Sequence, residues 1–95
     1  MRVQKVDLVA AIASALGVQA PKMSTGSTEP KEIFLIANEV LGLGLPTSLT
    51  KPELAKGIVE AAGHVWTPSS ESRGGTVTTD GLERVLAAVR LFVAQ

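Results

Sequence analysis

Apolar side chains recur at helical spacing near the start of the chain. Residues 5–16 place five of them on one face: Leu8, Val9, Ile12, Ala13 and Leu16. Gly17 follows and is typical of a helix end. Basic residues before an apolar run also resemble a signal peptide, but Lys5 and Asp7 lie close to the run and its pattern is amphipathic. We therefore expect a helix here.

A polar loop over 18–28, "VQAPKMSTGST", separates this helix from a second one. Thr28 is the expected cap of the second helix, with Glu29 and Pro30 in its first turn. The expected buried stripe consists of Ile33, Ile36, Ala37 and Val40. The segment 42–48, "GLGLPTS", then ends the helix and links the two halves of the chain.

The clearest helix start is the run from Thr50 to Glu53, "TKPE". It predicts a capping box, in which the Thr50 hydroxyl accepts from the Glu53 N–H and the Glu53 carboxylate accepts from the Thr50 N–H. Pro52 fits the first turn of such a helix. Its expected buried residues are Leu54, Ile58, Ala61 and Ala62, and Gly63 is the expected stop.

Residues 64–77 form the longest irregular stretch. We expect a short extended segment at 74–78, because β-branched residues favour that backbone. A final long helix is predicted from six apolar positions: Leu82, Val85, Leu86, Val89, Phe92 and Val93.

The predicted fold is all-α, a single domain over 1–95 with four main helices in two pseudo-repeated helix–loop–helix hairpins, at about 4–43 and 50–94. The first helices of the two units align 46 residues apart, the loops 48 apart and the closing helices 49 apart. Both loops contain Ser-x-Gly-x-Thr, in "STGST" at 24–28 and "SRGGT" at 72–76. We interpret this as an internal duplication.

A loop of this kind before a helix has the features of a phosphate site: small hydroxyls, a flexible backbone and free N–H groups at the positive helix end. Arg73 could reach a phosphate or the edge of a guanine. The expected nucleic-acid contacts are Lys22, Ser24, Thr25, Gly26, Ser27, Thr28, Lys31, Ser72, Arg73, Gly74, Gly75, Thr76 and Thr78.

The same residues have a simpler interpretation. Serine and threonine before a helix are usually caps, and glycine in a loop usually makes a turn. Glu71 and Asp80 flank the Arg73 loop and would weaken its attraction for phosphate. The loops match neither the P-loop nor the dinucleotide fingerprint.

Composition excludes several classes of protein. There is no cysteine, the nine basic and nine acidic residues balance, and no apolar run is long enough to span a membrane. We find no triad, acid–base pair or metal cluster, so we expect neither an enzyme nor a cofactor or metal. Trp66 is expected to close the core, with base stacking as the alternative. His64 is expected to have no special role.

The segments "STGSTEPKEIF", "LTKPELAKGIVEAAG" and "SRGGTVTTDGLERVLAAVR" resemble a small accessory domain associated with bacterial restriction endonucleases, over about residues 4–92. The middle segment is also similar to the helix start of SAP-type DNA-binding modules. The resemblance implies duplex DNA as the partner, DNA binding or target recognition as the role, and nuclease chemistry in a linked or associated domain. The absence of cysteine fits a cytoplasmic location, which we expect.

A protein–protein interaction or oligomerisation module is the competing interpretation. The balanced charge fits it, and so does the apolar end of the last helix. Leu91, Phe92 and Val93 are consecutive, so they cannot all face one small core. One of them could cover a partner helix or a second copy of the chain in a homodimer.

Overall fold

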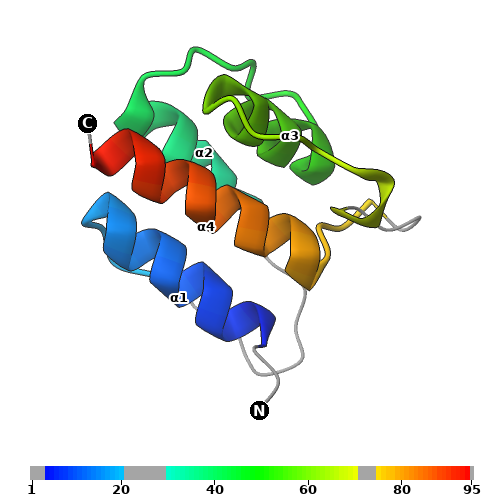
Figure 1. Ribbon diagram of the computed structural model, residues 1–95. Coiled ribbons are helices and arrows are strands. Elements are labelled where there is room, and N and C mark those ends of the chain that lie inside the picture. The colour runs from blue at the N-terminus through cyan, green and yellow to red at the C-terminus, as the bar shows by residue number, and fades with distance from the viewer. Residues whose placement is uncertain (1–3, 21–29, 71–74, 95) are drawn as a thin grey trace.

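The computed structural model describes residues 4–20, 30–70 and 75–94. These form four α-helices, α1 (Lys5–Leu16), α2 (Lys31–Leu41), α3 (Lys51–Ala61) and α4 (Thr79–Val93), and the short 3-10 helix η1 (Pro68–Ser70) (Figure 1). The all-α class is confirmed. Within the described residues between 74 and 78, only Val77 forms a bridge, and Thr78 beside it has extended backbone.

All four helices run in the same direction, from right to left in Figure 1. The two helices of each predicted helix–loop–helix unit are therefore parallel to each other. Helix α1 packs against α2 and α4, and α3 packs against the same two helices. The helices thus surround one core, with all four starts at one end and all four ends at the other.

Helix α1 and the two ends of α3 follow the sequence closely. The buried residues of α1 are the five predicted ones, and Gly17 adopts the left-handed conformation that ends the helix, with φ of 74°. The capping box of α3 is confirmed: the Thr50 N–H donates to Glu53 Oε1 at 3.1 Å, and the Glu53 N–H donates to Thr50 Oγ1 at 3.4 Å. Gly63 follows the last turn with φ of 83°.

Helix α2 is rotated relative to the prediction. Its buried residues are Ile33, Phe34, Ala37 and Asn38, whereas Val40 is 49% exposed. The Asn38 side chain explains the difference, because it accepts from the Leu45 N–H at 2.8 Å and donates to the Leu45 carbonyl at 2.9 Å. These bonds satisfy the buried amide and hold the link 42–50 against the helix.

The buried faces of α3 and α4 also differ in part from the prediction. Ala55 and Val59 are buried in α3, whereas the expected Ala61 is exposed. Helix α4 starts at Thr79, ahead of the first predicted apolar position, and Val93 is exposed. Leu45 lies against Gly57 of α3 and η1 packs against α4, and the periodicity of the sequence does not reveal which helix faces such segments cover.

The helix starts of the two halves are separated by nearly constant spacings along the chain. The starts of α1 and α3, Lys5 and Lys51, lie 46 positions apart. The starts of α2 and α4, Lys31 and Thr79, lie 48 apart, and their buried positions match at the same spacing. This spacing of 48 is one residue less than the 49 expected from the sequence. The same spacing of 48 therefore fits both the Ser-x-Gly-x-Thr sequences and the helices α2 and α4 that follow them.

Candidate nucleic-acid interface

The structure describes four of the thirteen residues expected to contact nucleic acid. Lys31 is the first residue of α2, and Gly75, Thr76 and Thr78 precede α4. The other nine lie outside the described residues: Lys22, Ser24, Thr25, Gly26, Ser27, Thr28, Ser72, Arg73 and Gly74. The described four nevertheless fix where the two candidate loops enter their helices.

The two loop-to-helix junctions lie at the same end of the bundle, because α2 and α4 run in the same direction (Figure 1). Helices α1 and α3 begin at this end as well. We call it the helix-start end. Three of the four helices have lysine as their first residue: Lys5, Lys31 and Lys51. Sequence reasoning singled out Lys31 alone, since the shared direction of the helices is visible only in three dimensions.

The start of α4 is held by its own side chains. Thr78 is the cap residue, and its Oγ1 accepts from the Gly81 N–H at 3.2 Å. The same hydroxyl donates to the Ser69 carbonyl at 2.6 Å. The Thr78 N–H donates to the Ser70 carbonyl at 3.0 Å. Thr78 therefore joins the helix start to η1, and its hydroxyl hydrogen is already used in this contact.

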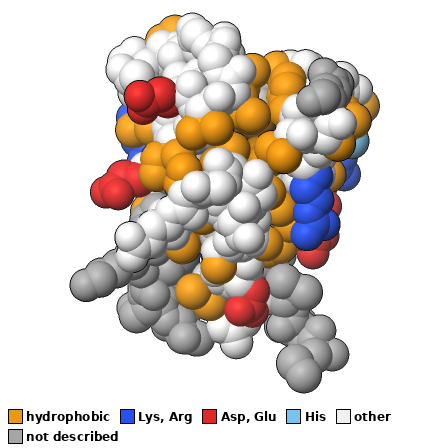
Figure 2. Space-filling view, turned by 90° about the vertical axis from the view of Figure 1, so that its left-hand side faces the viewer, with side chains coloured by type: hydrophobic (Ala, Val, Ile, Leu, Met, Phe, Trp, Pro, Cys, Tyr) orange, Lys and Arg blue, Asp and Glu red, His pale blue; other side chains and the backbone are white. Residues whose placement is uncertain are grey.

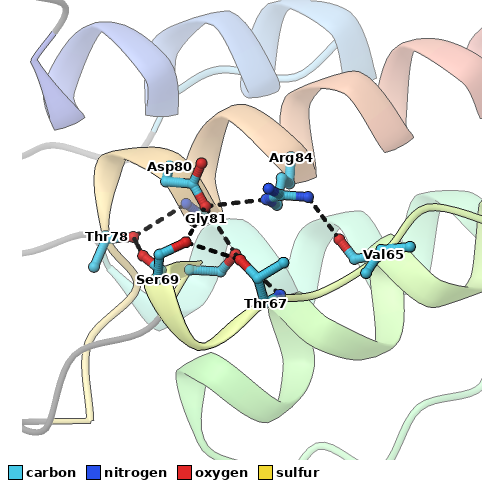
Figure 3. Close-up of polar contacts among 8 residues, drawn as sticks. Val65, Thr67, Ser69, Thr78, Asp80, Gly81 and Arg84 are labelled. Atoms are coloured by element: carbon cyan, nitrogen blue, oxygen red, sulfur yellow. Dashed lines mark hydrogen bonds and ion pairs between the residues drawn. The ribbon is translucent and has the colours of Figure 1, made fainter.

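Asp80 lies at the centre of a polar cluster at this junction (Figure 3). Its Oδ2 accepts from Arg84 Nε at 3.0 Å, from Ser70 Oγ at 2.9 Å and from Ser69 Oγ at 3.3 Å. Arg84 also donates to the Val65 carbonyl at 2.9 Å. We call Ser69, Ser70, Thr78, Asp80 and Arg84 the Asp80 cluster.

The Asp80 cluster changes the electrostatics of the loop. The hydrogen bond from Arg84, followed by that from Ser70, holds the pKa of the Asp80 carboxyl below its ordinary value. Asp80 is thus ionised at neutral pH, and its charge lies in direct contact with the Arg84 guanidinium. From the sequence, Asp80 counted against phosphate binding; in the structure, an adjacent cation compensates much of its charge.

The start of α2 is built differently. Its cap position is Pro30, which provides no side-chain cap, and Lys31 begins the helix. The expectation that Thr28 caps this helix with Pro30 in its first turn is therefore wrong. Thr28 itself lies outside the described residues. The first turn of α2 contains the acidic Glu32, at the position equivalent to Asp80.

Two other residues singled out from the sequence, Trp66 and His64, lie outside the Asp80 cluster. Trp66 is partly buried and packs against the core, which agrees with a core role. His64 is exposed, directly after the left-handed Gly63.

Across the described ranges, no group of three or more His, Cys, Asp or Glu side chains could hold a metal ion. None of the helices in those ranges is long and apolar enough to cross a membrane.

The opposite end of the molecule exposes several apolar side chains. Figure 2 views the left-hand side of Figure 1, where the helices finish, and hydrophobic side chains are spread over the middle of this face. Near the ends of α2 and α4, Val40 is 49%, Leu91 40% and Val93 53% exposed. We call Val40, Leu91 and Val93 the apolar end. The sequence pointed to part of it through the consecutive apolar residues 91–93.

No family model, curated protein or solved structure matches the chain. The function therefore has to be argued from the geometry of these two ends.

Proposed function

We propose that this chain is a DNA-binding module that contacts duplex backbone phosphates with its helix-start end. In this proposal it serves target recognition for a cytoplasmic restriction or defence nuclease, whose chemistry resides in a linked or associated domain. The Ser-x-Gly-x-Thr loops and Arg73 contribute the contacts closest to the DNA. Lys31 and the other helix-start lysines add a broader positive field.

The observation that carries the proposal is the gathering of helix starts at one end. A helix start bears a partial positive charge from its unpaired N–H groups, and a lysine there is disfavoured by about 0.3–1 kcal/mol. Lys5, Lys31 and Lys51 all begin helices at this end. Such a placement reduces folding stability but favours an anionic ligand. Four first-turn acids, Asp7, Glu32, Glu53 and Asp80, oppose this field and outnumber the three lysines by one.

The arrangement also suits a partner with two strands. Helices α1 and α3 both pack against α2 and α4, and we infer that an approximate half-turn about an axis parallel to the helices relates the two halves. That axis emerges from the helix-start end, with one loop-to-helix junction on each side of it. Duplex DNA has local two-fold axes that relate its two phosphate backbones. We infer that each junction faces one strand.

A fluorescence-anisotropy titration of labelled duplex DNA over a series of salt concentrations tests the proposal. The logarithm of the association constant should fall linearly with log salt, with a slope of about 0.9 per phosphate contacted. Arg73→Ala and Lys31→Ala should each weaken binding and reduce the slope by about one. Lys56→Ala is the matched control, since Lys56 is exposed in the middle of α3. Binding that is insensitive to salt, or equal loss in all three variants, would contradict the proposal.

The apolar end favours a second candidate function, protein–protein interaction or self-association. Val40, Leu91 and Val93 expose apolar surface that the fold itself does not use. Sedimentation velocity at several concentrations, with Val93→Ser as the comparison, tests self-association directly. A monomer at all concentrations that binds DNA would favour the first function over the homodimer.

A further inference from the structure

Helix α4 exposes a strip of four residues along most of its length. They are Glu83, Ala87, Arg90 and Ala94, and all four are exposed. Their spacing of four, three and four residues places them in line on one side of the helix, away from the core. In Figure 1, α4 lies at the front of the molecule, and no described segment crosses in front of it. We call these four residues the α4 strip.

The α4 strip contains one acidic and one basic residue, Glu83 and Arg90. They are separated by about 10 Å along the helix axis, which is too far for them to pair with each other. Among the described residues, neither has an ion-pair partner elsewhere in the chain. The other two charged residues of the helix, Asp80 and Arg84, pair with each other. Glu83 and Arg90 are therefore the charges that α4 leaves for a partner.

Small and apolar side chains surround these two charges. Ala87 lies about midway between them, and Leu91, next to Arg90, is 40% exposed. Helix α1 packs beside α4, and its exposed residues after the first turn are Ala10 and Ser14. Small side chains let a second helix approach closely, and covering exposed apolar ones is favourable.

We propose that the α4 strip binds the α4 strip of a second copy of the chain, with the two helices antiparallel across a two-fold axis near Ala87. In that arrangement Glu83 of each copy lies opposite Arg90 of the other, so both charges gain a partner. A parallel pair would instead place Glu83 against Glu83 and Arg90 against Arg90, and like charges repel. The inference rests on the second candidate function, self-association, and specifies its surface and geometry.

The direction of the helices also favours an antiparallel pair. All four helices of one copy run the same way, so their dipoles add instead of cancelling. A second copy in the opposite orientation opposes them. Because the same strip is used on both copies, the assembly closes at two.

The dimer is expected to be weak. A contact along one strip covers less than the roughly 800 Å² per partner that standard interfaces bury. We therefore expect a dissociation constant on the order of 10–100 µM. Sedimentation equilibrium at concentrations below and above this range measures it.

Charge reversal tests the pairing of Glu83 with Arg90, because both residues are exposed and the fold should tolerate their substitution. Glu83→Arg and Arg90→Glu each create like-charge pairs across the axis and should each weaken the dimer about tenfold or more. The double variant restores both pairs with their signs exchanged, so its dissociation constant should return to within about threefold of the wild type. Failure of this rescue, with circular dichroism showing a folded protein, would contradict the inference.

Glu60→Arg is the matched control for Glu83→Arg. Glu60 is exposed near the end of α3, outside the α4 strip, and its substitution makes the same change in charge. It should leave the dissociation constant unchanged. A loss equal to that of Glu83→Arg would show an effect of net charge alone and would contradict the inference.

Disulfide trapping tests the orientation, since the chain has no cysteine of its own. Ala87→Cys should give a cross-linked dimer under mild oxidation, because its two copies meet at the axis. Ala94→Cys should not, because in an antiparallel pair its two copies lie about 21 Å apart along the helices, beyond the reach of a disulfide. Efficient cross-linking through Ala94→Cys would indicate a parallel pair or contact through the apolar end, and would overturn the inference.

These outcomes separate the inference from both candidate functions. Association that Val93→Ser abolishes and charge reversal leaves unchanged would overturn the α4 contact, while self-association through the apolar end stands. A chain that stays monomeric and does not cross-link through Ala87→Cys would overturn the inference together with self-association, but not DNA binding. Cross-linking through Ala87→Cys in a protein that binds no DNA would support the inference although the first proposed function fails.

Discussion

Replacing Gly81 with alanine is expected to destabilise the fold, although alanine is the better helix former. In an exposed helix interior, Gly→Ala gains about 1 kcal/mol. At Gly81 the new Cβ would lie 2.2 Å from the Ser70 carbonyl oxygen, a backbone atom that cannot rotate away. Separating α4 from η1 to make room costs about 3 kcal/mol, the upper part of the range for overpacking. We therefore expect a net loss of about 2 kcal/mol in the free energy of unfolding, by subtraction.

Gly57 provides the matched control within the same molecule. A Cβ there would lie 2.9 Å from Leu45 Cδ1 and 3.0 Å from Leu45 Cδ2, the ends of a flexible side chain. A small rotation of Leu45 can relieve this contact, so Gly57→Ala should change the free energy of unfolding by less than about 1 kcal/mol. The two variants thus make the same chemical change beside a rigid neighbour and a flexible one.

Urea denaturation followed by circular dichroism measures both variants against the wild type. For a chain of this size, a loss of about 2 kcal/mol corresponds to a fall in Tm of roughly 8–16 °C. The urea m-value should stay unchanged if the substitutions act on the native state. If Gly81→Ala proves as stable as Gly57→Ala, the close contact between η1 and α4 does not exist in solution.

Three further predictions concern stability. Asn38→Ala should lower the free energy of unfolding by about 1–3 kcal/mol in urea titrations, because Leu45 would lose partners for both its N–H and its carbonyl. A smaller effect would contradict the importance of the two hydrogen bonds between Asn38 and Leu45. Thr50→Ala should lower the free energy of unfolding by about 1 kcal/mol, because the cap of α3 is lost. Thermal denaturation measures this loss, and Thr47→Ala, at an exposed position, is the neutral control. The pKa values of Glu53, through the Thr50 N–H, and of Asp80, through Arg84, are lowered in the folded state. Stability from these groups is therefore present above the pKa of the unfolded chain and is lost as the pH falls below about 5. Asp80→Asn should reduce this acid sensitivity in pH-dependent urea titrations, and an unchanged pH profile would argue against the Asp80–Arg84 contact.

Local signals in the sequence were enough to place the four helices. The capping box at Thr50 and the left-handed Gly17 act through neighbouring residues, so a one-dimensional pattern contains them. The direction of the helices was not predictable in this way. It depends on the connecting segments lying against the bundle, as Leu45 does beside Gly57, and such contacts join residues without a fixed sequence spacing.

In the candidate interface, too, local features could be predicted from the sequence and contacts between distant residues could not. The loop motif and Arg73 could be found from the sequence because they repeat, and they still await a test. The contacts of Asp80 could not be found, because its partners Ser69 and Ser70 lie ten or eleven positions away, in the short helix η1. Sequence reasoning assigned Asp80 a repulsive charge, and only its contacts suggest a different effect.

The packing of the first helix against the last has a consequence for how the chain folds. Helix α1 packs most extensively against α4, the element farthest from it along the chain. Contacts between distant segments slow folding, because a long stretch of chain must be ordered before they form. During synthesis on the ribosome, α1 must therefore wait for the last helix before it can bury its apolar face. A nascent or truncated chain without α4 would expose Leu8, Val9 and Ile12, and would be prone to aggregate.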